Sequence, residues 1–184
     1  MSGALAAIAG NFRTEAVVAA APVPGGHIHR SWRVETPAGA FLLQRLNRRV
    51  FPRPELVMEN VARVTGHLGG PLRLVPTLAG EAAHVDAAGE WWRLYEFIEG
   101  AVTRDTVTSA ADAYAAARAF GEFQRRLGGY AGPRLHATIP GFHDTPRRLA
   151  AFEAAVRADR AGRAAGCRAE IEALLARRAL APVL

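Results

Sequence analysis

Apolar residues recur at every second position in several short segments of the first hundred residues, which predicts strands. The expected strands cover residues 16–24, 28–35, 41–46, 74–78, 83–85 and 91–98. In the second of these, even spacing places Ile28, Trp32 and Val34 on one face. Short turns rich in glycine and proline, such as Gly25-Gly26, separate the strands. The segment therefore reads as an antiparallel sheet.

A helix interrupts these strands at residues 54–68. Val57, Val61, Val64 and Leu68 form one apolar stripe at helical spacing, and Gly69-Gly70-Pro71 ends it. A shorter helix is expected over residues 3–10, and after residue 100 the pattern becomes helical, with a loop at residues 133–146. The sequence therefore predicts an α+β chain with a boundary near residue 100, dividing it into domains 1–100 and 101–184.

Two side chains are expected to begin helices in the second half. Ser109-Ala-Ala-Asp112 matches a capping box, and Asp144 or Thr145 is placed to cap a helix that has Pro146 in its first turn.

Composition narrows the chemistry available. All 23 basic residues are arginine, which excludes a Walker A lysine and a Schiff-base lysine. Cys167 is the single cysteine, so neither an intramolecular disulfide nor a multi-cysteine zinc site is expected. The net charge is +6, but Asp and Glu are interleaved with the arginines, which favours a solvated surface over a nucleic-acid site. No apolar run reaches eighteen residues, so we expect no membrane partner and a cytoplasmic location.

The candidate chemistry lies in residues 25–99, in an ordered series. The Gly25-Gly26 turn lets backbone N–H groups approach phosphate oxygens. Arg45 supplies a cation on the third strand, and Glu59 a carboxylate on the following helix. Each feature alone is ordinary, but their order favours a kinase-like nucleotide lobe. Gln44 competes with Arg45 for the inward position, because a shift of one residue exchanges their faces.

Several short strings carry a resemblance to a known family. They are Gly-His-Ile, Leu-Gln-Arg-Leu-Asn, Met-Glu-Asn-Val-Ala-Arg-Val, Tyr-Glu-Phe-Ile-Glu-Gly and Ile-Pro-Gly-Phe-His-Asp-Thr-Pro. Together they resemble the aminoglycoside phosphotransferase/choline kinase superfamily, and within it the N-acetylhexosamine 1-kinases. The resemblance implies a protein-kinase-like N-lobe, made of an antiparallel sheet and one helix, followed by the first helices of a helical C-lobe. It also implies an ATP-dependent kinase acting on the anomeric hydroxyl of an amino sugar.

The resemblance also implies roles for particular residues. Nucleotide contacts are expected from Gly25, Gly26, Ser31, Arg45, Glu59, Glu96, Phe97 and Ile98, the last three through a hinge backbone that binds adenine. Substrate contacts are expected from His27, His143 and Asp144, although capping is favoured for the last two. The loop departs from the family at His29-Arg30-Ser31, where Asn-Asp-Thr is usual.

The family's catalytic string, His-x-Asp-x-x-x-x-Asn, does not occur, because no asparagine follows Asn60. The expectation is therefore the N-terminal portion of a sugar kinase that binds nucleotide but contains no catalytic or metal-binding residue. Mg²⁺ would be bound only in a complete enzyme, and a complementing C-terminal fragment is an expected partner. The alternative is a non-catalytic module that binds nucleotide or another protein.

Overall fold

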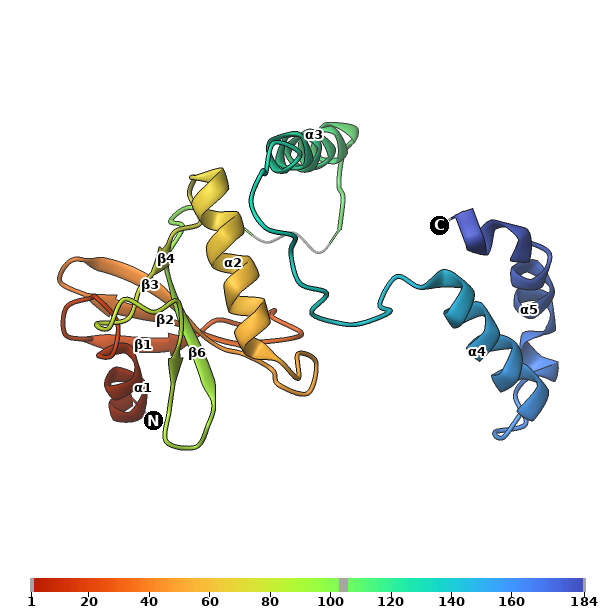
Figure 1. Ribbon diagram of the computed structural model, residues 1–184, viewed down its shortest axis with the longest axis horizontal. Helices are drawn as coiled ribbons and strands as arrows, with labels where there is room; N and C mark the ends of the chain where they lie inside the picture. The colour runs from red at the N-terminus through yellow and green to blue at the C-terminus, as the bar shows by residue number, and fades with distance from the viewer. Residues whose placement is uncertain (1, 103–105, 184) are drawn as a thin grey trace. The chain divides into compact units, whose positions relative to one another are not determined.

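The computed structural model describes residues 2–102 and 106–183 (Figure 1). The chain forms two compact units, one up to Thr138 and one from Ile139 onward. The predicted change from strands to helices is present, since β6 ends at Glu96 and α3 begins at Ala110. That this change near residue 100 is also a domain boundary stays a prediction.

The first unit contains an antiparallel sheet, which confirms the predicted α+β class. Its strands are β1 (Ala19–Pro22), β2 (Arg30–Thr36), β3 (Gly39–Arg45), β4 (Leu74–Val75), β5 (His84–Val85) and β6 (Trp91–Glu96). The order is β1-β2-β3-β6-β4, with β5 also paired to β6. The sequence overestimated most strand lengths, and Ile28 lies outside β2 and is exposed, because the loop after Gly25 extends to His29.

One face of the sheet packs against α1 (Ser2–Ala9) and the segment that follows it. Leu5 and Phe12 meet Val34, Leu43 and Leu94 from β2, β3 and β6 in one buried cluster. Burial of this apolar area, at about 25 cal/mol per Å², is the main force that holds α1 on the sheet.

The opposite face packs against α2 (Pro54–Leu68), whose bounds match the predicted helix (Figure 1). Val57 and Met58 form a second buried cluster with Leu46, just beyond β3. Leu46 and Gln44 are two residues apart, so both side chains lie on the α2 side of the sheet. Leu43 and Arg45 lie on the α1 side.

Helix α3 (Ala110–Leu127) belongs to the first unit. Ser109 caps it by accepting a hydrogen bond from the Asp112 backbone N–H, as predicted. Near its other end, the guanidinium of Arg126 donates to the Leu68 and Gly69 carbonyls at the end of α2. These contacts satisfy carbonyls that the last turn of α2 leaves without helical partners.

The second unit consists of α4 (Thr145–Ala158), η1 (Ala165–Cys167), α5 (Arg168–Leu175) and η2 (Arg178–Val183). Asp144 caps α4, since its Oδ1 accepts from the Arg147 backbone N–H at 2.9 Å. This confirms the predicted cap. Leu149 and Phe152 on α4 share an apolar hollow with Leu174 and Ala181.

Candidate functional site

A basic cavity of about 580 Å³ lies at one end of the sheet in the first unit. Its walls come from the β1–β2 loop, the end of β3 and the connection from β3 to α2. The lining residues are Gly26, His27, Ile28, His29, Arg30, Arg45, Leu46, Asn47, Arg48, Arg49 and Glu90. Four guanidinium groups and one carboxylate line it, so the cavity attracts anions. It brings together Gly26, His27 and Arg45 from the predicted site and adds three arginines that sequence reasoning missed.

The glycine turn has a backbone that other residues rarely adopt. Gly25 has φ of +90°, in the region where a side chain is strained. At Gly26, a Cβ atom would lie 3.2 Å from the His29 carbonyl oxygen. Both glycines therefore allow a tight loop whose backbone is exposed beside the cavity.

His29 holds this loop against the β3–α2 connection. Its Nδ1 accepts a hydrogen bond from the Asn47 backbone N–H at 3.2 Å, and its ring stacks on Phe51 at 5.6 Å. Burial lowers the pKa of His29, and the positive charge of Arg93 lowers it further. The imidazole is therefore neutral at neutral pH, as an accepting Nδ1 requires.

Arg45 and Glu59 do not form the expected ion pair. The Arg45 guanidinium lies 5.9 Å from the centre of the Trp92 ring, on the α1 side of the sheet. The Glu59 carboxylate instead contacts Arg63 one turn along α2 and the His136 Nε2, the latter at 2.6 Å. The physical reason is strand register, because Gln44 rather than Arg45 faces α2.

On the α2 side, a polar row crosses three strands. Ser31, Gln44 and Arg93 are successive register partners on β2, β3 and β6. Gln44 Nε2 donates to Ser31 Oγ at 2.9 Å, and Gln44 Oε1 accepts from Arg93 Nε at 3.0 Å. Arg93 is only 9% exposed, and this burial lowers the pKa of its guanidinium group. Sequence reasoning missed Arg93, which lies among apolar residues in a strand buried on both faces.

The predicted hinge follows β6 directly. The backbone N–H groups of Glu96 and Phe97 donate hydrogen bonds to the carbonyls of Arg73 and Ala40, respectively, both at 3.0 Å. Within the described residues, the Ile98 N–H has no such partner. Of the three predicted hinge amides, Ile98 is thus the one available to a ligand.

The outer side of α2 binds the segment after α3. The Asn60 side chain exchanges two hydrogen bonds with the backbone of His136, each 2.9 Å long. The Arg63 guanidinium donates to the Arg134 carbonyl at 3.3 Å. Glu59 thus belongs to a set of contacts that fixes residues 134–136 on α2.

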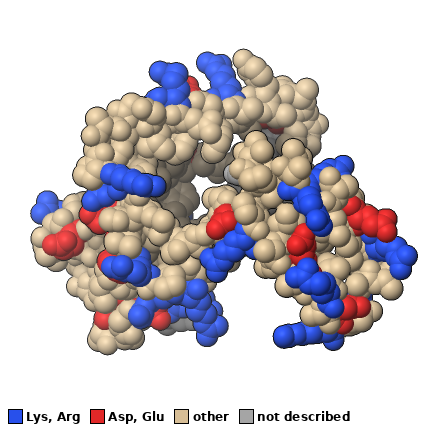
Figure 2. All heavy atoms as spheres, turned by 45° about the vertical axis from the view of Figure 1, so that its right-hand side comes forward, with Lys and Arg blue, Asp and Glu red and all other residues tan. Residues whose placement is uncertain are grey.

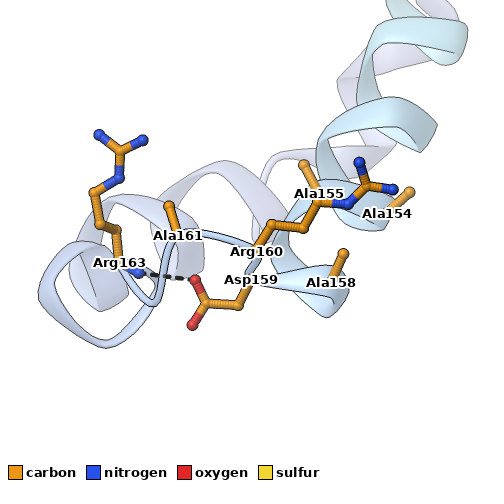
Figure 3. Close-up of a pocket in the computed structure, with 7 residues that line it drawn as sticks. All are labelled: Ala154, Ala155, Ala158, Asp159, Arg160, Ala161 and Arg163. Atoms are coloured by element: carbon orange, nitrogen blue, oxygen red, sulfur yellow. Dashed lines mark hydrogen bonds between the residues drawn. The ribbon is translucent and has the colours of Figure 1, made fainter.

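His143 and Asp144 lie in the second unit and are not among the residues that line this cavity. Asp144 is engaged in its cap, and the His143 ring packs edge-on against Phe142 at 4.8 Å. Figure 3 shows another hollow in this unit, at the C-terminal end of α4. Four alanines line it, and its Asp159 carboxylate accepts from the Arg163 backbone N–H at 2.8 Å. That carboxylate stabilises a turn.

Three further observations concern surface charge, possible metal ligands and membrane-spanning helices. Figure 2 shows arginines interspersed with Asp and Glu on the face in view. Among residues 2–102 and 106–183, no three His, Cys, Asp or Glu side chains are grouped so as to hold a metal ion. In the same part of the chain, no helix is long and apolar enough to cross a membrane.

Comparison with known proteins gives two findings. A model of the phosphotransferase enzyme family matches residues 19–184. The fold is also similar to the crystal structure of a spectinomycin phosphotransferase in complex with ADP and spectinomycin, with a TM-score of 0.57 and 11% identity. The match covers 94% of this chain and 56% of the other, so this chain spans little more than half of that protein's length. At this identity the likeness concerns the fold alone.

Proposed function

Because the chain belongs to the phosphotransferase enzyme family, we propose that it is the nucleotide-binding part of an ATP-dependent sugar phosphotransferase. The observation that carries the proposal is the cavity in which the glycine turn and four arginines converge. The substrate class we propose is an amino sugar of the N-acetylhexosamine type. His27, whose exposed imidazole lines the cavity beside Gly26, is the candidate to contact it.

The donors around the cavity suit the phosphates of ATP. Guanidinium groups offer several N–H donors in a planar fork, which matches phosphate oxygens in a bidentate manner. We propose that Arg45, Arg48 and Arg49 bind the phosphate chain together with the Gly26 backbone, and that the Ile98 amide binds adenine. Bound ATP would supply the phosphoryl group, while these residues bind and orient it.

We propose further that phosphoryl transfer requires a complementing C-terminal fragment. Transfer in this class of enzyme needs an Asp at the acceptor hydroxyl and side chains that hold Mg²⁺. The string His-x-Asp-x-x-x-x-Asn does not occur in these 184 residues, and among the described residues no three His, Cys, Asp or Glu side chains are grouped as metal ligands. No transfer step is therefore assigned to this chain alone.

Nucleotide binding is tested by calorimetry of the full chain with ATP, ADP, adenosine and tripolyphosphate. We expect affinity to increase from adenosine to ATP, and the double variant Arg48→Met with Arg49→Met to weaken ATP binding by about tenfold or more. Arg13→Met is the matched control, because it removes an exposed arginine that does not line the cavity. Absence of adenine-nucleotide binding by the wild-type chain would refute the proposed function.

The non-catalytic part of the proposal has its own test. The chain is incubated with ATP, Mg²⁺ and either N-acetylglucosamine or N-acetylgalactosamine, and sugar phosphate is measured. We expect none from the chain alone, and formation only after a family C-terminal fragment bearing the catalytic string is added. Sugar phosphate formed by the chain alone would contradict this part.

An interaction module is the second candidate, and α3 favours it. Phe120 and Phe123 stack on each other at 6.0 Å and remain 61% and 40% exposed. Exposed aromatic pairs on one helix are typical of a protein-binding face. A stable monomer whose melting temperature rises with ATP would support this module. Aggregation that a C-terminal fragment reverses would support the incomplete enzyme.

A further inference from the structure

The polar row of Ser31, Gln44 and Arg93 ends in a cation without a carboxylate. Arg93 is 9% exposed, and none of the ion pairs among the described residues includes it. A buried charge is costly unless it is paired and hydrogen-bonded. The charge of Arg93 in this row therefore contributes little to the stability of the fold alone.

Most N–H donors of Arg93 have no strong hydrogen-bond acceptor among the described residues. A guanidinium has five N–H donors. Nε donates to Gln44, Nη1 lies 4.0 Å from the Met58 sulfur, and the guanidinium carbon lies 5.2 Å from the centre of the Tyr95 ring. A thioether is a weak acceptor, and an anionic oxygen would displace it. The chemistry of the site therefore points to an anion as its ligand.

Arg93 lies one strand away from the place where a kinase-like lobe holds its cation. In such lobes a lysine on the third strand binds the nucleotide phosphates and faces the next helix. Here the residue of β3 that faces α2 is Gln44, and its direct partner on the neighbouring strand is Arg93. Neighbouring strands are about 4.8 Å apart. The cation of this chain therefore lies on the strand next to β3 and on the same face of the sheet.

We propose that Arg93 binds the phosphate chain of a nucleoside triphosphate on the α2 side of the sheet, with Gln44 as its positioning residue. The inference rests on the proposed function and deepens it. Ser31 extends the row, and its hydroxyl is a further donor for the same phosphates. Arg45 does not take this place, because it lies on the α1 side and binds from the end of the sheet.

The basic cavity and Arg93 are electrostatically connected through His29. His29 lines the cavity, and the charge of Arg93 is one of the two causes that lower its pKa. The field of Arg93 thus reaches the wall that the phosphates would approach. The row also adjoins the cavity along the chain, because Ser31 follows Arg30 and Gln44 precedes Arg45, two residues that line it.

Calorimetry on the full chain tests the proposal with Arg93→Met. Methionine fills a similar volume beside Met58, and it removes a buried charge that no carboxylate of the described residues pairs. We expect affinity for ATP and tripolyphosphate to fall by about 10- to 100-fold, while affinity for adenosine changes by less than about twofold. Arg13→Met removes the same charge elsewhere and should leave all three unchanged.

A swap variant separates ligand binding from a structural role. Gln44→Lys combined with Arg93→Met returns the cation to β3, and we expect ATP affinity to recover to within about fivefold of the wild-type value. Loss of ATP affinity in Arg93→Met without recovery in the swap would overturn the proposal. Unchanged ATP affinity in Arg93→Met would also overturn it and leave the proposed function standing. Failure of the wild-type chain to bind any adenine nucleotide would overturn both.

Nuclear magnetic resonance of the wild-type chain tests the proposal without depending on whether a variant folds. The Arg93 Nε–H is held by Gln44, so its proton exchanges slowly enough to be observed. We expect its ¹⁵N and ¹H resonances to shift on addition of tripolyphosphate and not on addition of adenosine. Resonances that stay in place at saturating tripolyphosphate would overturn the assignment of Arg93.

Discussion

Substitution of Asn60 by alanine is expected to release residues 134–136 from α2. The Asn60 amide is the centre of this contact, because it both donates to and accepts from the backbone of His136. Alanine keeps the helix, since it is the best helix former, and removes both hydrogen bonds. The His136 backbone groups then depend on water, and the segment opens more often.

The magnitude follows from the two bonds. Each is 2.9 Å long and partly buried, and a typical bond contributes about 0.5–1.5 kcal/mol net. Loss of both lowers the free energy of local opening by about 1–3 kcal/mol. Because 1.4 kcal/mol is a factor of ten, the His136 amide should exchange about 5- to 150-fold faster.

Amide hydrogen exchange measured residue by residue is the assay. Asn47→Ala is the matched control, because its Oδ1 accepts from the nearby Arg49 backbone N–H and it makes no bond to residues 134–136. It should leave exchange at His136 unchanged. If Asn60→Ala exchanges at His136 within about twofold of the wild type, the reciprocal pair does not hold the segment.

Three further outcomes are expected. Leu43→Ala should lower the free energy of unfolding in urea by about 3 kcal/mol, because the side chain is fully buried between α1 and the sheet. Asp86→Ala removes a carboxylate that accepts from the Trp92 indole and two backbone N–H groups, and should cost about 2 kcal/mol at pH 7. Burial raises the pKa of Asp86 but these bonds lower it more, so the difference from wild type should shrink as pH falls below 3.8. The folded-state pKa of His29 lies below its ordinary 6.5, so stability should decrease as pH falls through that value, and an NMR titration should show a higher His29 pKa in Arg93→Met.

Elements with local signals were predictable from the sequence. The bounds of α2 followed from a proline at its start, a glycine after its end and an apolar stripe between them. The Ser109 and Asp144 caps followed for the same reason, since a cap depends on residues three apart in the chain. The glycine turn was also predictable, because glycine readily adopts a positive φ, as Gly25 does here.

The inward residues of the site were not predictable from local pattern. Whether Gln44 or Arg45 faces α2 depends on strand register, and both are polar residues that end an apolar run. Arg93 lies among Trp92, Leu94 and Tyr95 in a strand buried on both faces, so no alternation marks it. Its partner Gln44 is 49 residues away, and only the pairing of β3 with β6 joins them.

The positions of Arg93 and Glu59 follow from one property of α2. Successive residues of a helix point about 100° apart, so α2 cannot direct both Met58 and Glu59 at the sheet. Met58 is 3% exposed and lies against Arg93, which leaves Glu59 on the outer side with His136. With no carboxylate from α2 opposite the strand cation, the charge of Arg93 is balanced only when an anion binds.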